Sequence, residues 1–332
     1  MEKLSAAKIL GATKPFVAVR ALAYLVLVLV MLVVGVIGLF LCYQFAKAGS
    51  GAAVFITAVI FFGGLFGLIR FAQRYILYMI KAAHVAAITE FIKTGQVPVT
   101  ENGYKGVVAY GTEKIKNHFG AANVAFVADA LITGATRQIM RWLNRAEKLL
   151  SWIPGADKAM AFINFVISTA LNYIDEAVLS YIFYHSEEGN AFKKACDALS
   201  YYAQSWKGML KGALKVGAFV WILRAVIYLI LVAVFNAVGG AIAGAEVSGA
   251  GFFAIVCGIL LAFIILYGIE AIIVEPYATC IMINDYYKAI EGQPLKRDLH
   301  GTLCKVSGKF RELFNKSGQS QPAQPSEIPP IV

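Results

Sequence analysis

The chain has 332 residues, of which 59% are hydrophobic and only 15% are charged. This composition is too apolar for the surface of a water-soluble domain, so it indicates an integral membrane protein. The formal net charge of +10 would also suit a nucleic-acid-binding surface. However, the basic residues flank apolar runs, and attraction to anionic lipid explains that placement more simply. We therefore expect lipid, and no nucleic acid, as a partner.

The first apolar run covers residues 21–46 and contains no formal charge. It exceeds the roughly 20 residues that a helix needs to cross a bilayer. It is also longer than the apolar part of a cleavable signal peptide, about 7 to 15 residues, so we expect residues 1–50 in the mature protein. A second run at residues 51–69 follows after a short connection. Residues 1–20 are thus predicted to form a basic cytoplasmic N-terminus before a transmembrane hairpin over residues 21–69.

A second pair of apolar runs occupies residues 216–244 and 249–274, which predicts another hairpin over residues 213–275. Uninterrupted runs of this length favour helices over the alternating strands of a membrane barrel. The predicted fold class is therefore an all-α integral membrane protein. Its two transmembrane helical hairpins are separated by a long amphipathic helical region, residues 70–212.

The remaining segments are predicted from composition. Residues 276–316 continue the last span as a cytoplasmic helical extension, and residues 317–332 have the composition of a disordered tail. Within the region between the hairpins, residues 121–136 and 159–174 are apolar but short of a span. They are expected either to lie in the interface or to re-enter the bilayer, so four and six spans both remain open.

Basic residues mark one side of the predicted hairpins, while the short connections within each hairpin carry few charges. The basic residues next to the first hairpin are Lys3, Lys8, Lys14, Arg20, Arg70, Arg74 and Lys81. By the positive-inside rule, both termini and the central region are cytoplasmic. Lipid on that side is expected to be anionic. Because four to six short spans enclose little volume, we also expect a homo-oligomer.

The two hairpins begin with similar sequences. Residues 20–30 read RALAYLVLVLV and residues 224–234 read RAVIYLILVAV, with seven of eleven positions identical. This agreement predicts a duplicated hairpin with a pseudo-twofold axis along the membrane normal. Chance agreement between apolar segments is the alternative, with anchoring at the interface as the reason for the shared Arg and Tyr. The predicted interfacial anchors are Arg20, Tyr24, Arg224 and Tyr228.

Small residues at a four-residue spacing allow close approach of helix backbones in membranes. Two such pairs occur in the predicted spans, Gly63 with Gly67 and Gly240 with Gly244. We interpret them as helix-packing positions.

Ionisable residues in or near membrane spans are costly to bury and are therefore candidates for function. In this chain the candidates for a transport path, or for charges at the interface, are Asp129, Asp175, Glu176, Glu270 and Glu275. The last two lie near the cytoplasmic end of a span, where long side chains reach the headgroups. The first three become functional candidates if their helices enter the membrane.

The sequence contains no H-E-x-x-H, P-loop or G-x-S-x-G motif, and its four histidines are far apart. We therefore expect no enzymatic activity, no catalytic residues, no metal site and no cofactor.

From His118 onward the chain resembles the C-terminal half of the choline transporter-like family. The similar pieces are HFG at residues 118–120, AVLSYIFY at 177–184, FKKACDA at 192–198 and INDYYKAIEG at 283–292. The family's additional N-terminal spans have no counterpart here. The resemblance implies that the central apolar helices enter the membrane and that a choline-like or other small organic solute is moved.

Two functions are compatible with these observations. The first is a multi-pass transporter or channel for a small solute, such as an organic cation. The second is a non-enzymatic membrane scaffold whose amphipathic helices organise lipid or recruit a partner. They differ at Asp129, Asp175 and Glu176, which would face a membrane cavity only in the first.

Overall fold

The computed structural model of the chain describes its residues in several ranges. These are 5–97, 105–106, 109–110, 113–114, 165–166, 168–170, 172–185, 191–242, 268–296, 298–316 and 318. Asp129, Gly244 and most of the last predicted span lie outside these ranges, and so does nearly all of the predicted tail.

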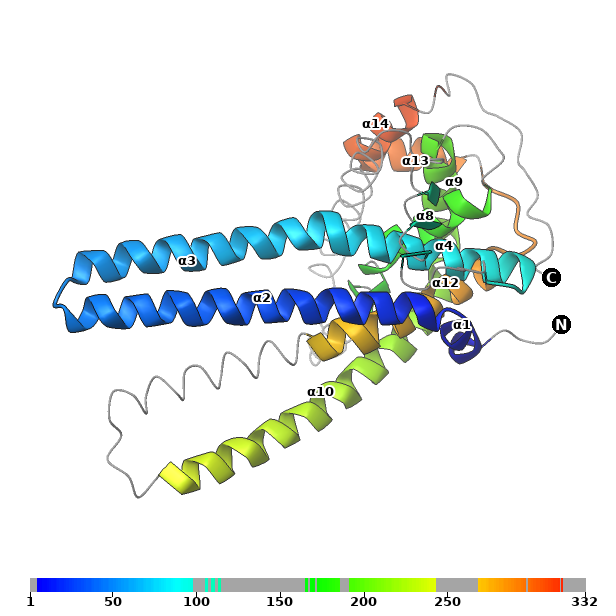
Figure 1. Ribbon diagram of the computed structural model, residues 1–332. Coiled ribbons are helices and arrows are strands. Elements are labelled where there is room, and N and C mark those ends of the chain that lie inside the picture. Colours follow the sequence, from blue (N-terminus) through cyan, green and yellow to red (C-terminus); the bar gives the residue numbers. More distant parts are fainter. Residues whose placement is uncertain are drawn as a thin grey trace, which may run out of the picture. The chain divides into compact units, whose positions relative to one another are not determined.

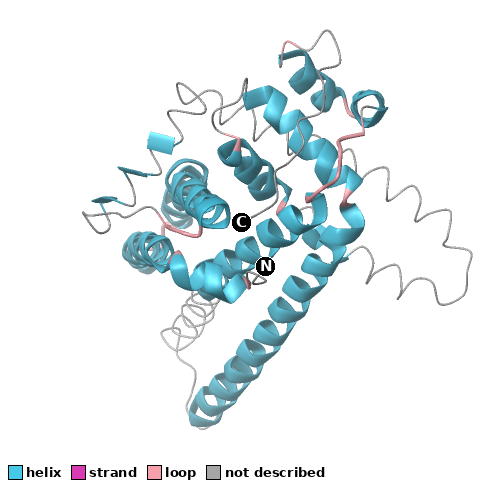
Figure 2. Ribbon diagram, turned by 90° about the vertical axis from the view of Figure 1, so that its right-hand side faces the viewer, coloured by secondary structure: helices cyan, strands magenta, loops and turns pink. Residues whose placement is uncertain are grey.

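Every element in the described ranges is a helix (Figures 1 and 2). In chain order they are α1 (Ala6–Ala12), α2 (Lys14–Lys47), α3 (Gly51–Phe71), η1 (Ala72–Leu77), α4 (Tyr78–Thr94), α8 (Ile174–Tyr184), α9 (Ala191–Gln204), α10 (Trp206–Ile242), η2 (Glu270–Val274), α12 (Glu275–Ile290), α13 (Asp298–Val306) and α14 (Gly308–Lys316). The segments η1 and η2 have π-helical hydrogen bonding.

The chain divides into two compact units, which we describe separately. The span unit comprises residues 15–81 and 225–275, and the body unit comprises residues 1–14, 82–224 and 276–332. The six segments predicted from the sequence divide the chain differently, and their boundaries stay a prediction.

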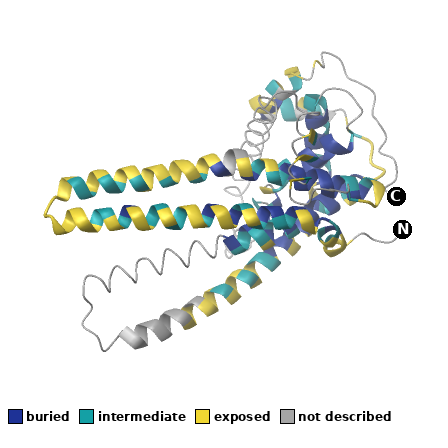
Figure 3. Ribbon diagram, in the orientation of Figure 1, coloured by how far each residue is buried: buried dark blue, intermediate teal, exposed yellow. Residues whose placement is uncertain are grey.

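Three described helices are long and apolar enough to cross a membrane: α2, α3 and residues Trp206–Ile230 of α10. Large apolar side chains are exposed along all three, whereas most residues of α4, α8 and α12 are buried (Figure 3). Exposed apolar surface on this scale marks contact with lipid or a partner. The all-helical class and the membrane character are confirmed to this extent; the second hairpin, the amphipathic nature of residues 70–212 and the orientation of the termini stay predictions.

Helices α2 and α3 are joined by a tight connection at residues 48–50. Gly49 adopts a positive φ of 72°, and the Ser50 side chain accepts a hydrogen bond from the Ala53 N–H at the start of α3. The two helices approach closely at Gly38, where an added Cβ would lie 2.8 Å from the Cβ of Phe61. A glycine is required there because the neighbouring atom belongs to the rigid base of a side chain.

The body unit holds a buried chain of hydroxyl groups that joins α4, α8 and α12. Thr89 donates to the Val85 carbonyl at 2.7 Å, and its oxygen lies 2.6 Å from that of Ser180. Ser180 in turn lies 3.0 Å from the Tyr287 hydroxyl. Each hydroxyl has one proton to donate. The direction therefore follows: Tyr287 donates to Ser180, and Ser180 donates to Thr89.

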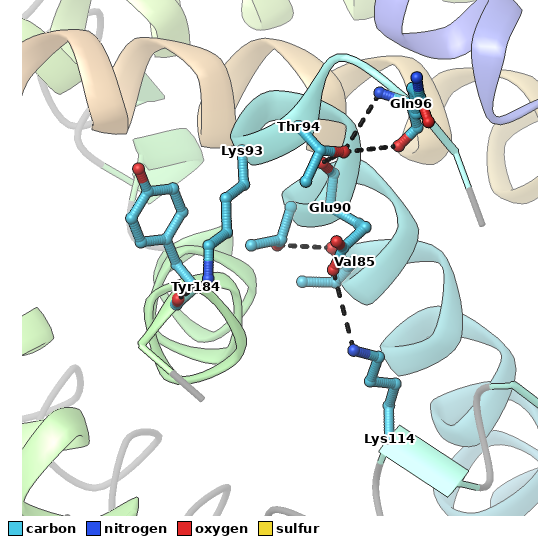
Figure 4. Close-up of polar contacts among 8 residues, drawn as sticks. Val85, Glu90, Lys93, Thr94, Gln96, Lys114 and Tyr184 are labelled. Carbon is cyan, nitrogen blue, oxygen red and sulfur yellow. Dashed lines mark hydrogen bonds and ion pairs between the residues drawn. The ribbon is translucent and has the colours of Figure 1, made fainter. Parts of the chain in front are cut away.

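Further polar contacts secure the end of α4 (Figure 4). Lys93 donates to the backbone carbonyl of Tyr184 at 3.2 Å, and its ammonium lies 5.5 Å from the centre of the Tyr184 ring. Lys114 lies 3.8 Å from the carboxylate of Glu90. The helix ends at Thr94, and the φ of 74° at the following Gly95 is accessible to glycine at little cost.

The N-terminal part of α10 packs closely against α12. A Cβ on Gly208 would lie 2.8 Å from the Cβ of Ala289, and one on Gly212 would lie 2.9 Å from a carboxylate oxygen of Asp285. Lys215 donates to the same carboxylate at 3.0 Å. The break before α10 is at Ser205, whose hydroxyl donates to the Ala289 carbonyl. Close backbone approach thus fixes this crossing.

Helices α13 and α14 complete the body unit on α9. His300 Nε2 lies 3.1 Å from Asp197 Oδ1, and Phe310 is buried beside the His300 ring. Ser307 directly precedes α14, and its side chain accepts a hydrogen bond from the Phe310 N–H.

Replacing Gly38 with alanine should lower the melting temperature of the detergent-solubilised protein by several degrees. The new Cβ would overlap Phe61, and overpacking of this kind costs about 1–3 kcal/mol. Gly64→Ala is the matched control, because a Cβ there meets no atom within 4 Å. Alanine also has the better helix propensity, so the control should be neutral or stabilising. Equal stability of Gly38→Ala and the wild type would contradict the contact.

Ser180→Ala should lower the free energy of unfolding by about 1–3 kcal/mol, because it removes a buried hydroxyl that both donates and accepts. Ser200→Ala is the control: Ser200 is equally buried, but its hydroxyl donates to the Cys196 carbonyl of its own helix. Denaturant titration of both variants measures the difference. A cost for Ser180→Ala no greater than that of the control would show that the chain of hydroxyls does not join the three helices.

Candidate functional site

An ion pair within the span unit brings together two charges that the sequence analysis singled out. Arg20 lies in the second turn of α2 and is 4% exposed. Its guanidinium donates to the carboxylate of Glu275, the first residue of α12. The Glu275 side chain is 43% exposed, so one partner is buried and the other is open to its surroundings.

Apolar and aromatic side chains lie next to this pair. The Arg20 guanidinium is 5.8 Å from the centre of the Tyr24 ring, one helical turn further along α2. Tyr24 itself belongs to a buried cluster of side chains, Tyr24, Leu27, Ala72, Leu77 and Ala271. Charge interactions are stronger where water is excluded, and cation–π contacts add to them. The ion pair is therefore held in a position where breaking it is costly.

The cluster is built from both π-helical segments. Ala72 and Leu77 come from η1, and Ala271 comes from η2. In η2 the Glu275 N–H bonds to the carbonyl of Glu270, five residues earlier. Pro276 follows directly, and a proline leaves the carbonyl four residues before it without its usual partner. A π-helical turn accommodates such an interruption, and π-helical turns are frequent at functional sites.

The two segments occupy corresponding positions in the two halves of the chain. Each directly precedes a helix of similar length, α4 with 17 residues and α12 with 16. Each of these helices is followed by a glycine in the left-handed region, Gly95 with φ 74° and Gly292 with φ 66°. The two helices differ in charge at their first residue, because α12 begins with Glu275 and α4 begins with Tyr78. The similarity between the halves thus extends beyond the apolar spans.

Two other candidate charges lie in the body unit. Asp175 and Glu176 occupy the first turn of α8, where negative charge is favoured by the helix dipole. Glu176 is 3% exposed. Burial, followed by the charges of Glu176 and Asp175, raises the pKa of Tyr202 above its usual range. Tyr202 therefore stays neutral and donates to the Ala170 carbonyl at 2.6 Å.

The remaining predicted positions are spread along the spans. Arg224 and Tyr228 are exposed on α10, and Gly240 lies near the end of the same helix. Gly63 and Gly67 of α3 have open space where a Cβ would be, so their packing role stays a prediction. Asp129 and Gly244 lie outside the described residues.

Several close contacts were not predicted from the sequence. Gly208 and Gly212 have the same four-residue spacing as the predicted packing pairs, and this signal would have found them. Gly38 has no partner at that spacing. Thr13 and His84 form another buried contact, with 3.0 Å between Thr13 Oγ1 and His84 Nε2. Nothing in the local sequence marks these residues, because their partners are far away along the chain.

The arrangement allows one cation to replace another at the Glu275 carboxylate. A half-exposed carboxylate bound to a buried guanidinium can be captured by another cation, which would release the arginine. Among the described residues, His, Cys, Asp and Glu side chains form no group of three that could hold a metal ion.

No protein-family model, curated protein or solved structure matched the chain.

Replacing Arg20 with Met and Glu275 with Gln, singly and together, should reveal a coupling of about 1–2 kcal/mol in the free energy of unfolding. This is below the range for a fully buried pair because Glu275 is half exposed. Lys215 and Asp285 form the control pair, since Lys215 is 61% exposed and such pairs contribute about 0–1 kcal/mol. Additive effects at Arg20 and Glu275 would rule out a strong ion pair.

Proposed function

We propose that the protein is a multi-pass membrane transporter for a small solute, and that the Arg20–Glu275 pair lies on the solute path. Three helices that are long and apolar enough to cross a membrane support integration into a bilayer. The close contact of α3 with Gly38 on α2 supports pairing of the first two spans as a hairpin. The second hairpin over residues 213–275, the cytoplasmic termini and the homo-oligomer are parts of the same proposal.

The observation that carries this proposal is the charged pair beside two π-helical segments. Ionisable groups within membrane spans are costly to bury and are default candidates for substrate or ion pathways. Interrupted helices at corresponding positions of two repeats point to the binding site in many transporters. Arg20, Glu275, η1 and η2 combine both features within one unit.

A small organic cation fits this site by its chemistry. The Glu275 carboxylate is partly exposed and provides a negative charge, and the centre of the Tyr24 ring lies 5.8 Å from the guanidinium that is bound to this carboxylate. A bound cation would take the place of Arg20 at the carboxylate. Binding would then favour the state in which the pair is open, which is how a solute shifts a two-state equilibrium. The resemblance to the choline transporter-like family leads to the same solute class.

A scaffold is the second candidate, and the body unit favours it. Helix α8 has 11 residues and α9 has 14, both shorter than a span. Asp175 and Glu176 lie on α8, where Glu176 is buried within the body unit. A packed helical body attached to membrane helices is suited to recruiting a partner.

Uptake of labelled choline and related small cations into proteoliposomes tests the first proposal. Wild-type protein should give saturable uptake above empty liposomes. Glu275→Gln should reduce it at least tenfold while the protein remains folded, because the carboxylate that receives the cation is gone.

Asp285→Asn is the matched control, because it neutralises a paired carboxylate of the body unit and should leave uptake unchanged. Full uptake by Glu275→Gln would remove the pair from the solute path. No uptake by folded wild-type protein for any cation tested would favour the scaffold.

A further inference from the structure

The start of α10 has two distinct faces. One face is buried and consists of Met209, Gly212, Ala213, Val216 and Gly217. The opposite face is exposed and carries Trp206, Lys207, Lys211, Leu214, Lys215, Trp221 and Ile222. The buried face explains how the helix attaches to α12. On the exposed face, Lys215 pairs with Asp285 and the Trp221 ring lies edge-on to that of Phe165, with 6.3 Å between ring centres, but most of the surface of this face stays uncovered by the described residues.

The exposed face is cationic at its N-terminal end. Lys207, Lys211 and Lys215 follow one another at four-residue intervals, so their Cα atoms are about 6 Å apart along one side of the helix. Lys215 is paired with Asp285. Lys207 and Lys211 form no ion pair with any described residue, and both lie in the first two turns, where the helix dipole adds positive potential.

The same face becomes apolar in the direction of the span. Trp221 is 66% exposed and Ile222 is 65% exposed, and both lie within the Trp206–Ile230 segment that is apolar enough to cross a membrane. Lys211 and Trp221 are about 15 Å apart along the helix axis. A helix that leaves a bilayer is expected to place tryptophan at the edge of the hydrocarbon and lysine further out, in the headgroup layer. The exposed face of α10 has its residues in this order.

We propose that Lys207 and Lys211 form a binding site for the headgroup of an anionic phospholipid on the face of α10. The phosphate would lie between the two ammonium groups, and the acyl chains would run along Leu214, Trp221 and Ile222. A phospholipid fits better than a free anion because the cationic and apolar parts of the face are continuous on one helix. A soluble acidic protein would leave the apolar part uncovered. The proposal does not depend on transport.

Native mass spectrometry of the full-length protein in detergent tests this site, with phosphatidylglycerol competing against phosphatidylcholine of the same chain length. Wild-type protein should retain phosphatidylglycerol preferentially. The double variant Lys207→Gln/Lys211→Gln should lose about tenfold to thirtyfold of that preference, since each lysine near an anionic headgroup contributes about one tenfold step or less. Glutamine has a helix propensity similar to that of lysine, so the helix should persist.

Lys309→Gln/Lys316→Gln is the matched control, because it removes the same number of charges from α14, where both lysines pair with Glu312. The control should keep the wild-type preference, as should Lys207→Arg/Lys211→Arg. A loss below threefold in the glutamine variant, or an equal loss in the control, would overturn the site. Competition by soluble glycerol phosphate as effective as that by the lipid would also overturn it, in favour of a small-anion site.

Discussion

The requirement to keep large apolar surfaces out of water dominates this molecule. Leucine, valine, isoleucine and phenylalanine side chains are exposed along α2, α3 and α10. Leaving one such side chain in water rather than in an apolar medium costs about 1.5–3 kcal/mol. These helices are therefore stable only with lipid or another apolar partner around them, and helical hydrogen bonding satisfies their backbones there.

The chain departs from regular α-helix at two places near the ends of apolar segments. The π-helical segment η1 directly follows α3, η2 forms the last residues of the predicted apolar run 249–274, and both contribute side chains to the cluster around Tyr24. The Arg20–Glu275 pair lies beside that cluster. A charged pair is costly to place next to apolar side chains, and irregular hydrogen bonding weakens a helix. Their combination at one place is the basis of the proposed solute path.

The body unit is stabilised in another way. Its helices are short, and short helices depend on tertiary contacts. The chain from Tyr287 through Ser180 to Thr89 links α12, α8 and α4, and each hydroxyl in it has a partner. Helix α10 then packs against α12 at Gly208 and Gly212. Buried hydroxyl contacts and close helix approaches thus join the helices of this unit.

The sequence alone was sufficient to predict the helical membrane class, because apolar runs such as residues 21–46 exceed the length of a span. The partners of buried groups were decided only by the tertiary structure. Arg20 and Glu275 were each identified as single charges near an interface, yet their sequence positions are far apart, and nothing local indicates that one neutralises the other. Ser180 and Gly38 were not identified, because a hydroxyl or a small residue becomes significant only through the atom that approaches it.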